Sequence, residues 1–522
     1  MRFSIRAAFC AVCALVMIPA GASAFCGFYV GGAETTLYNE GSMVVLMRDG
    51  ETTVVSMQND YKGPAEDFAL VIPVPEILEE EQVRTLERAV FAHVDRLAAP
   101  RLVEYWEQDP CMEPAMEIDF TSATVERESS EPHDDDDYEE PRDLGVRVEA
   151  EFAVGEYDIV ILSAEYSAGL DTWLRRNGYR IPEGAERVLR PYVEQDMKFF
   201  VAKVNMRRVE YAEGEALLSP LRFHYDSEDF FLPIRLGLLN SPGEQDVIVH
   251  VLARGMRFEV ANYDNYAIPT NLVVSNAVRD GFGAFYDALF TRMHEAHPGS
   301  VITEYAWSAG SCDPCPDPPL EADELVALGA DVIPAYASAV RNGRVQTGFS
   351  NDFVLTRMHL RVSASSAGED LHFRPGPAIE GGRGTPDVEG QMSRGMQAYP
   401  VNNFQGRYAI LHAWEGAIEC ETPQRGIWGG PPSTQMASSQ PLAAAGLAFA
   451  STASVSLEGY LTQAIPELGA DTDTLPQGDV TPPPPPPPPP GGGCASCAVE
   501  DAPPTSALLA LAVFAVLRRR RS

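Results

Sequence analysis

Residues 294–297 have the sequence His-Glu-Ala-His and carry two side chains that commonly bind zinc. The helical zinc motif of metalloproteases places its histidines four residues apart, with a glutamate directly after the first. Here His294 and His297 are three residues apart, and the sequence offers no obvious third ligand. The pattern therefore favours two polar residues near a helix end, followed by a Pro-Gly pair, over a metal site.

Cys312 and Cys315 enclose an Asp-Pro pair, a spacing that can lower the pKa of a thiol and support redox chemistry. Their segment is rich in Asp and Pro, whereas a thioredoxin-like site needs a strand that leads into a helix. A structural disulfide is therefore favoured, and the alternative, a thiol oxidoreductase, predicts reduction of insulin. Zinc binding by this pair with Cys111 and Cys420 is less natural in an oxidising compartment.

Motifs that mark common enzyme classes are absent from the sequence, including the Gly-x-Ser-x-Gly turn, the phosphate-binding loop and the dinucleotide-binding glycines. Several histidines fall inside predicted strands, where a hydrogen-bonded structural imidazole is usual: His224, His250, His359 and His412. We therefore expect no cofactor, and a binding or structural protein is favoured over an enzyme. The alternative is an extracellular enzyme that holds a metal through His294, His297 or the acidic residues 126–143.

Five tryptophans could line a ligand groove, as aromatic side chains do in proteins that bind carbohydrates: Trp106, Trp173, Trp307, Trp414 and Trp428. Tryptophan is more often a core residue. Trp173 in particular has the helical spacing that predicts burial.

Hydrophobic patterns predict the elements that position these residues. Apolar runs rich in β-branched and aromatic residues predict strands at residues 42–48, 52–61, 68–74, 146–152, 157–162, 197–204, 221–225, 230–236, 246–252, 256–260, 353–362 and 407–414. Asp49 and Gly50, between the first two strands, predict a hairpin turn, since such a turn needs positive φ. Helical spacing predicts helices at residues 79–97, 170–176, 185–196, 276–297 and 320–340. The fold class is therefore α+β, with β-rich mixed sheets and several helices. Residues 61–75 and 225–236 share a Tyr, a Glu-Asp-Phe step and an apolar run broken by proline, which permits two related β halves.

The amino terminus predicts export. Residues 1–24 combine two arginines, an apolar stretch and Ala-Ser-Ala before Phe25, the pattern of a signal peptide cleaved after Ala24. Outside the cytoplasm, thiols tend to become disulfides, and the candidates are Cys26, Cys111, Cys312, Cys315 and Cys420. Because five is odd, one should be free or should pair with Cys494 or Cys497, and the sequence does not choose the pairing.

The net charge argues against polyanionic partners. The formal charge is −36, and such a surface repels nucleic acid and anionic lipid. Residues 126–143 form an acidic stretch with little to bury, which predicts a mobile insert in an ectodomain spanning residues 25–469. Its four adjacent aspartates lack the ligand spacing of a calcium-binding EF-hand loop, so a solvated charge run is favoured.

The carboxyl-terminal residues predict an anchor. Residues 470–493 form a Pro/Gly-rich linker with nine consecutive prolines, which stand as a stiff extended rod. Residues 494–522 hold two cysteines, an apolar run and a cationic end: Cys494, Cys497, residues 507–517, and Arg518, Arg519, Arg520 and Arg521. The eleven apolar residues would span about 16 Å as a helix, against roughly 30 Å of hydrocarbon. They suit a temporary stop-transfer segment held by arginines on the cytoplasmic side.

Two family resemblances follow from these residues. Residues 26–28, 61–75, 170–200, 355–360 and 407–420 resemble the bacterial family known as domain of unknown function 2330, a resemblance that implies no activity, cofactor or catalytic residue. The carboxyl-terminal segment resembles the MYXO-CTERM sorting signal of myxobacterial surface proteins. That resemblance implies secretion machinery and a sorting protease as partners, with processing near Cys494 or Cys497. It also implies attachment to the cell surface or outer membrane through the tail.

Overall fold

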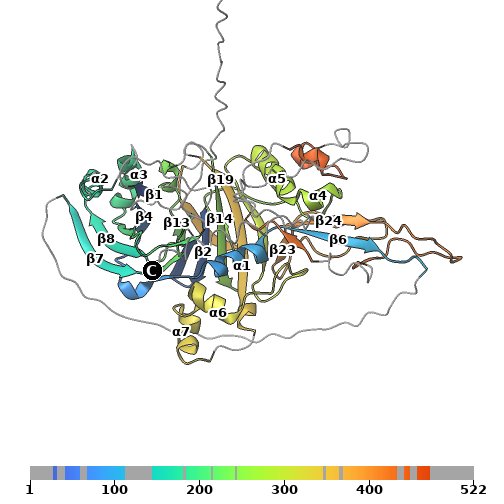
Figure 1. Cartoon of the computed structure of the whole chain (residues 1–522), viewed down its shortest axis with the longest axis horizontal. Helices are drawn as coiled ribbons and strands as arrows, with labels where there is room; N and C mark the ends of the chain where they lie inside the picture. The colour runs from blue at the N-terminus through green and yellow to red at the C-terminus, as the bar shows by residue number, and fades with distance from the viewer. Residues whose placement is uncertain are drawn as a thin grey trace, which may run out of the picture. The chain divides into compact units, whose positions relative to one another are not determined.

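The computed structural model describes residues 28–31, 42–58, 68–111, 144–179, 181, 184–212, 215–240, 244–344, 348–363, 368–431, 440–446 and 455–470. The chain divides into two compact units, Met1–Thr481 and Pro482–Ser522, and every described residue belongs to the first. Figure 1 shows the chain with its main elements labelled. The predicted signal peptide, the acidic insert, the linker beyond residue 470 and the carboxyl-terminal segment lie outside the described residues, as do Cys26, Cys494, Cys497 and Arg518 to Arg521.

A mixed sheet of eleven strands forms the centre of this unit, with the order β22-β21-β23-β18-β19-β14-β2-β3-β12-β5 and with β16 beside β18. Its strands are β2 (Ser42–Asp49), β3 (Thr52–Gln58), β5 (Val83–Thr85), β12 (Leu221–Asp226), β14 (Gln245–Arg254), β16 (Asn265–Ala267), β18 (Val301–Ser308), β19 (Phe353–Val362), β21 (Ile379–Gly381), β22 (Gln397–Ala398) and β23 (Asn403–Gln405). The two longest strands, β14 and β19, pair antiparallel along their whole length, and β2 runs parallel to β14.

The turn between β2 and β3 follows from its residue types. Gly50 has a φ of 59°, a left-handed conformation that glycine adopts without steric cost. The two strands pair antiparallel on either side of it, so the hairpin predicted at Asp49 and Gly50 is confirmed. Both strands are buried over nearly their whole length because other layers cover both faces of the sheet.

A second, five-stranded sheet packs on one face of the central sheet. Its strands, in the order β1-β4-β9-β8-β7, are β1 (Phe28–Gly31), β4 (Phe68–Val74), β7 (Val146–Val154), β8 (Tyr157–Ala164) and β9 (Lys198–Val204). Side chains alternate across it: Leu70 and Ile72 contribute to the core shared with the central sheet, while Ala69 and Val71 pack with helices. These helices are α2 (Ser167–Arg176) and α3 (Ala185–Glu194), on the outer side of β4 and β8 (Figure 1).

Helices also cover the opposite face of the central sheet. One apolar cluster joins that face to α1 (Arg88–Ala98), α6 (Ala322–Leu325) and the short helix η3 (Val326–Ala330). Another joins β18 to α5 (Phe282–Ala296), α4 (Ala277–Asp280) and strand β24 (Arg407–His412). The remaining helices are α7 (Pro334–Arg341), η1 (Glu80–Gln82), η2 (Gly237–Asn240), η4 (Phe349–Asp352), η7 (Leu457–Gly459) and η8 (Pro466–Leu468).

Smaller sheets complete the described part of the chain. β24 lies between β17 (Leu272–Val273) and β6 (Arg101–Glu107), and β6 also pairs with β25 (Trp428–Gly429) and β26 (Leu442–Ala443). The others are the pair β10 (Glu210–Ala212) and β11 (Glu215–Leu217), and the three strands β13 (Phe231–Leu232), β15 (Arg257–Val260) and β20 (Leu371–Gly376).

The predicted α+β fold with β-rich mixed sheets and several helices is confirmed, while several element boundaries were wrong. The helix predicted at residues 79–97 begins only at Arg88, because residues 83–85 extend the edge of the central sheet as β5, beside β12. The helix predicted at 276–297 is interrupted at Gly281, where a Cβ atom would lie 3.0 Å from the Tyr460 hydroxyl. Residues 61–75 and 225–236, whose shared pattern permitted two related β halves, contain β4 in the first segment and the end of β12 and β13 in the second, and these strands lie in three different sheets.

Charged side chains lie buried between the central sheet and its helices. On β19 the odd-numbered side chains face the helices. The first two, Phe353 and Leu355, are apolar, and the next two, Arg357 and His359, are ionisable. Arg357 is fully buried and donates hydrogen bonds to Asp95 of α1 and, at 2.7 Å, to Glu304 of β18. The register between β18 and β19 shifts between Thr303 and Tyr305, so Glu304 occupies a β-bulge that directs its side chain toward Arg357.

The same carboxylate has two further partners. Glu304 accepts a hydrogen bond from the Tyr286 hydroxyl at 2.6 Å, and the His359 ring lies 3.4 Å away. Burial opposes ionisation of Glu304, but the hydrogen bond from His359 and the charge of Arg357 outweigh it and lower the Glu304 pKa to about 2. His359 contacts Asp246 of β14 on its other side, at 3.1 Å. The buried charges and the Tyr286 hydroxyl therefore connect α1, α5, β14, β18 and β19.

Removing the central cation should destabilise the protein strongly. Arg357→Met leaves Glu304 and Asp95 buried without their main counter-charge, and we expect a loss of about 3–5 kcal/mol of unfolding free energy. Denaturant-induced unfolding measures it. The control is Arg341→Met on α7, where the arginine is exposed and a change below about 0.5 kcal/mol is expected. Equal stabilities for the two variants would contradict this account of the buried charges.

Candidate functional site

A cavity of about 540 Å³ opens where strands β6 and β24 end. Its lining combines two tryptophans with histidine, arginine, glutamate and asparagine: Trp106, Glu107, Asn276, Arg279, Leu411, His412, Ala413, Trp414, Glu415 and Gly416. We call this cavity the tryptophan pocket. Its volume falls in the range of roughly 300–1,000 Å³ that is usual for small-molecule sites.

Strand pairing brings the lining residues together although they are far apart in sequence. β6 and β24 run parallel, with Trp106 directly opposite His412. The carboxyl ends of parallel strands meet at one edge of a sheet, so the segments that follow both strands can surround a common space. Arg279 of α4 reaches the same edge and forms an ion pair with Glu104 of β6.

Glu104 also positions the imidazole of His412. The Nε2 atom of His412 lies 2.6 Å from the Glu104 carboxylate, and the His412 ring stacks on Trp106 with centroids 4.7 Å apart. Burial and the positive charge of Arg279 lower the pKa of His412. A neutral ring at neutral pH donates its Nε2 proton to Glu104, and its Nδ1 atom is then an acceptor.

A second carboxylate holds the loop that follows β24. Glu107 accepts hydrogen bonds from Arg425 at 2.6 and 2.8 Å, from the Gly426 amide at 2.8 Å and from the Trp414 amide at 3.0 Å. The hydrogen bond from Arg425, together with those from the two amides, lowers the pKa of Glu107 to about 2. Glu107 therefore fixes the backbone on which Trp414 stands.

The loop around Trp414 requires a glycine at position 416, two residues further along the chain. A Cβ atom at Gly416 would lie 2.5 Å from the Trp414 indole, so residue 416 must lack a side chain for the loop to cover the ring this closely. The Trp414 indole nitrogen is buried and has no hydrogen-bond partner within the described chain. A ligand acceptor or an ordered water would satisfy it.

A disulfide between Cys111 and Cys420 joins the two segments that extend beyond β6 and β24. The sequence named both cysteines as candidates but left their partners open, and the structure decides the pairing. The cysteines are 309 residues apart, so the bond removes a large loop-closure entropy from the unfolded chain, about 6 kcal/mol on the entropic account. Backbone hydrogen bonds from Gln108 to Ile427 and from Gln424 to Pro110, both 2.8 Å, run alongside it.

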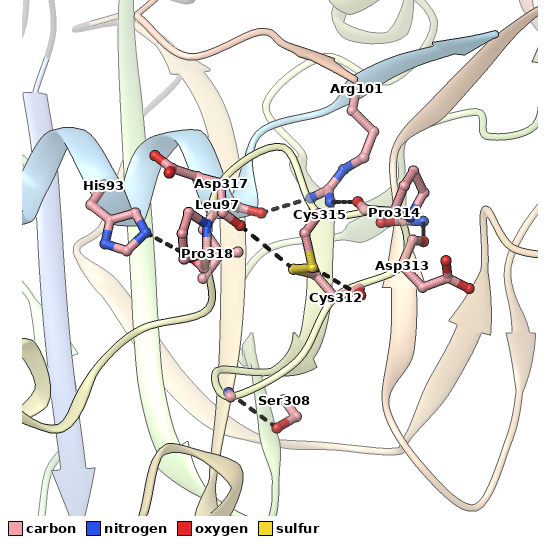
Figure 2. Close-up of a disulfide and its surroundings, with 12 residues drawn as sticks. His93, Leu97, Arg101, Ser308, Cys312, Asp313, Pro314, Cys315, Asp317 and Pro318 are labelled. Carbon is pink, nitrogen blue, oxygen red and sulfur yellow. Dashed lines mark hydrogen bonds between the residues drawn. A yellow bond between two sulfur atoms is a disulfide. The ribbon is translucent and has the colours of Figure 1, made fainter. Parts of the chain in front are cut away.

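Cys312 and Cys315 form the second described disulfide, with their Cα atoms 5.0 Å apart in the loop after β18 (Figure 2). Because this bond closes a ring of only four residues, the same account assigns it about 2 kcal/mol. The two disulfides therefore differ greatly in how much they constrain the unfolded chain.

The histidines of the possible zinc motif have separate environments. His294 lies on α5 with its Nε2 atom 3.3 Å from Glu244, and His297 follows the helix and stacks on Tyr266 with centroids 3.7 Å apart. Across the described ranges, no group of three or more His, Cys, Asp or Glu side chains is arranged to hold a metal ion. The acidic insert, residues 126–143, lies outside those ranges.

The other tryptophans have different settings. Trp307 is buried on β18 beneath Arg383, and Trp428 is half-buried on β25 and donates to the Asp387 carbonyl. Trp173 on α2, for which burial was predicted, is half-buried and stacks on Tyr179. The sequence had thus marked Trp106 and Trp414 as possible groove residues without separating them from these three. Glu104, Glu107, Asn276 and Arg279 carried no signal, because β6 was not predicted and their proximity arises from strand pairing.

No helix in the described part of the chain is long and apolar enough to cross a membrane. The anchor residues of the predicted sorting signal lie beyond residue 470.

One family model matches residues 19–374 of the chain, and its description is "Uncharacterized protein conserved in bacteria (DUF2330)". No curated protein and no solved structure matches the chain.

The pH dependence of stability should identify the role of Glu107. Since folding lowers the pKa of Glu107 to about 2, its stabilising effect is fully present above about pH 4.5 and is lost as the pH falls toward 2. At neutral pH, Glu107→Gln should therefore be less stable than wild type by about 1–3 kcal/mol, the range for hydrogen bonds to a charged group. This difference should shrink between about pH 4.5 and 2, as measured by denaturant unfolding at each pH.

Glu415→Gln is the matched control for this experiment, because Glu415 is exposed in the same loop. Its stability should follow that of wild type at every pH. A wild-type advantage over Glu107→Gln that stays constant down to pH 2 would contradict the proposed role of the Glu107 carboxylate.

Proposed function

Because the chain belongs to this family of uncharacterised bacterial proteins, whose description names no activity, we propose a function from the pocket itself. The protein is an exported, surface-anchored binding protein that takes a neutral saccharide into the tryptophan pocket. The observation that carries this proposal is the lining of the pocket, where Trp106 and Trp414 stand beside Glu107, Asn276 and Arg279.

A saccharide suits this combination of side chains. A sugar ring offers an apolar face of C–H groups, which packs on an indole, and hydroxyl groups around its edge, which both donate and accept hydrogen bonds. Asn276 can do both with its amide, Arg279 donates, and Glu415 accepts. The buried indole nitrogen of Trp414 adds a donor that no described protein atom satisfies.

The charges of the pocket favour a neutral ligand. In the lining, Arg279 is paired with Glu104 and Glu107 is paired with Arg425, while the exposed Glu415 carboxylate would repel an anionic ligand. The chain as a whole carries a formal charge of −36, which repels polyanions at long range. Neutral sugars avoid this repulsion.

The pocket is held in shape before a ligand arrives. The Cys111–Cys420 disulfide and the hydrogen bonds of Glu107 hold the segments that carry Trp106 and Trp414. A preorganised site loses less conformational entropy on binding than a flexible one. Such rigidity supports a binding role.

Export and anchoring are supported by the two ends of the sequence. Residues 1–24 have the pattern of a signal peptide, and residues 494–522 that of a sorting signal with Cys494 or Cys497 as the processed residue. The proline-rich linker between the ectodomain and that signal would hold the binding unit away from the cell envelope. Disulfides in the ectodomain agree with an oxidising location.

Removing the Trp414 indole should weaken saccharide binding. A panel of neutral mono- and disaccharides identifies a ligand for the wild-type protein, and titration calorimetry measures its affinity. We expect Trp414→Ala to weaken that affinity by about 10- to 100-fold, since an aromatic stack contributes about 1–3 kcal/mol once its buried area is included.

Trp173→Ala is the control, because Trp173 is a half-buried tryptophan on α2 that does not line the pocket. It should bind like wild type. Failure of every saccharide to bind, or equal affinities for wild type and Trp414→Ala, would overturn the proposed ligand class.

Deleting residues 494–522 tests the anchor. The shortened protein should be secreted into the medium, because it keeps its signal peptide and loses its attachment site. Fractionation of cells and medium measures the change, and Arg341→Ala, an exposed substitution on α7, serves as the control that should remain cell-associated. Retention of the deletion variant on the cell surface, or a cytosolic location for the intact protein, would rule out anchoring by the tail.

A further inference from the structure

The disulfide between Cys312 and Cys315 lies in a loop that is closed without it. The loop follows β18, and its ends are joined by a backbone hydrogen bond of 3.0 Å from the Leu320 amide to the Ala309 carbonyl. Cys315 is exposed, while Cys312 is partly buried against the apolar cluster under α1. One sulfur is therefore accessible to an attacking thiol, and the other is sheltered.

Side chains from the buried strands hold the two residues between the cysteines. The Arg101 Nη1 atom of β6 donates to the Pro314 carbonyl at 2.8 Å, and the Gln405 Nε2 atom of β23 donates to the Asp313 carbonyl at 2.6 Å. Figure 2 shows the Arg101 guanidinium directed at the loop from one side. These hydrogen bonds involve neither sulfur, so we expect them to persist when the disulfide is reduced.

Residues of α1 hold the second half of the loop. His93 contacts the Pro318 carbonyl at 2.8 Å (Figure 2). Arg96 pairs with Asp317 at 2.7 Å. Because both halves are held in this way, reduction should leave the two thiols facing each other. Re-formation of the disulfide then requires little rearrangement.

Arg101 places a positive charge beside this loop. Its side chain is fully buried, and its described hydrogen bonds all go to neutral carbonyls, those of Pro314, Leu97 and Ala99. Its Nε atom is buried with no partner in the described structure. Asp313, between the two cysteines, already interacts electrostatically with Arg101. A buried cation without a hydrogen-bonded carboxylate favours further negative charge nearby, and a cysteine thiolate would add it after reduction.

We propose that Cys312 and Cys315 form a reversible redox pair that exchanges electrons with a protein dithiol. A thiolate of the partner attacks the Cys315 sulfur, the S–S bond breaks, and the Cys312 sulfur leaves with the bonding electrons. The partner's second thiolate then attacks the partner's first sulfur, which is bonded to Cys315 in the mixed disulfide. The partner's own disulfide forms, and Cys315 leaves as a thiolate. The partner dithiol is oxidised to a disulfide, Cys312 and Cys315 are reduced, and the two protons of the partner's thiols balance their charge.

The Cys111–Cys420 disulfide is an internal control within the same chain. It ties together segments 309 residues apart, and its reduction releases the loop that carries Trp414 from the end of β6. It should therefore resist reductants that open the Cys312–Cys315 bond.

A redox titration of the full wild-type chain tests the proposal without any substitution. The protein is equilibrated with increasing ratios of reduced to oxidised dithiothreitol, alkylated, and mapped peptide by peptide, so that the other cysteines do not interfere. The Cys312–Cys315 pair should open at a ratio at least about tenfold lower than Cys111–Cys420, with the near-ultraviolet circular dichroism unchanged. Simultaneous opening of both disulfides, earlier opening of Cys111–Cys420, or loss of the fold with the first reduction would overturn it.

Trapping separates the roles of the two sulfurs. In Cys312→Ser the exposed Cys315 remains, and it should form a mixed disulfide with oxidised glutathione at least about tenfold faster than Cys312 does in Cys315→Ser. Mass spectrometry of the adduct measures both rates, and circular dichroism checks that both variants are folded. Equal rates, or a faster reaction of Cys312, would refute Cys315 as the attacked sulfur.

Discussion

The contact of Arg357 with Glu304 and Asp95 is the interaction on which the rest of the described structure depends. Isolated charges cost several kcal/mol each to bury, and that cost is recovered only when opposite charges and hydrogen bonds surround them. Here the cation lies on β19, and its two carboxylates lie on β18 and α1. The interaction therefore fixes a helix and two strands relative to one another, with more geometric specificity than apolar packing alone provides.

Both candidate sites begin at the elements that this interaction fixes. After α1 the chain passes through Ala99 and Pro100 directly into β6, whose far end carries Trp106 and Glu107. After β18 it enters the loop with Cys312 and Cys315, which packs back against α1. Arg101 is the first residue of β6, the strand that leads to the tryptophan pocket. Its side chain donates a hydrogen bond to Pro314 in the Cys312–Cys315 loop, so it connects the two sites.

The two disulfides differ in how much of the chain they enclose and therefore in how strongly they constrain it. Cys111 and Cys420 come from remote parts of the chain and brace the walls of the tryptophan pocket. Cys312 and Cys315 close a small ring inside a loop that hydrogen bonds already hold. The first arrangement limits the unfolded chain, whereas the second leaves the bond free to open and close without a large structural consequence.

Local sequence patterns predicted most of the regular elements that are long and strongly apolar, such as β14 and β19, and the glycine turn between β2 and β3. They missed β6 and β18, whose apolar residues are interrupted by Glu104 and Glu304. These glutamates are acceptable in strands only because Arg279 and Arg357, distant in sequence, neutralise them. Local propensity cannot include such a partner, so in the sequence alone a glutamate argues against a buried strand even where the folded chain pairs it with an arginine.

The amino-acid sequence by itself determined the α+β class, the cysteines that are candidates for disulfides, and the strongly acidic character of the chain, with its formal charge of −36. These properties depend on composition and short-range periodicity. Only the tertiary structure decided that Trp106 and Trp414 share a pocket, that Cys111 pairs with Cys420, and that Arg101 lies against the Cys312–Cys315 loop. Each of these depends on the pairing and register of strands hundreds of residues apart, because contacts across a sheet are set by which strands become neighbours and not by their order in the chain.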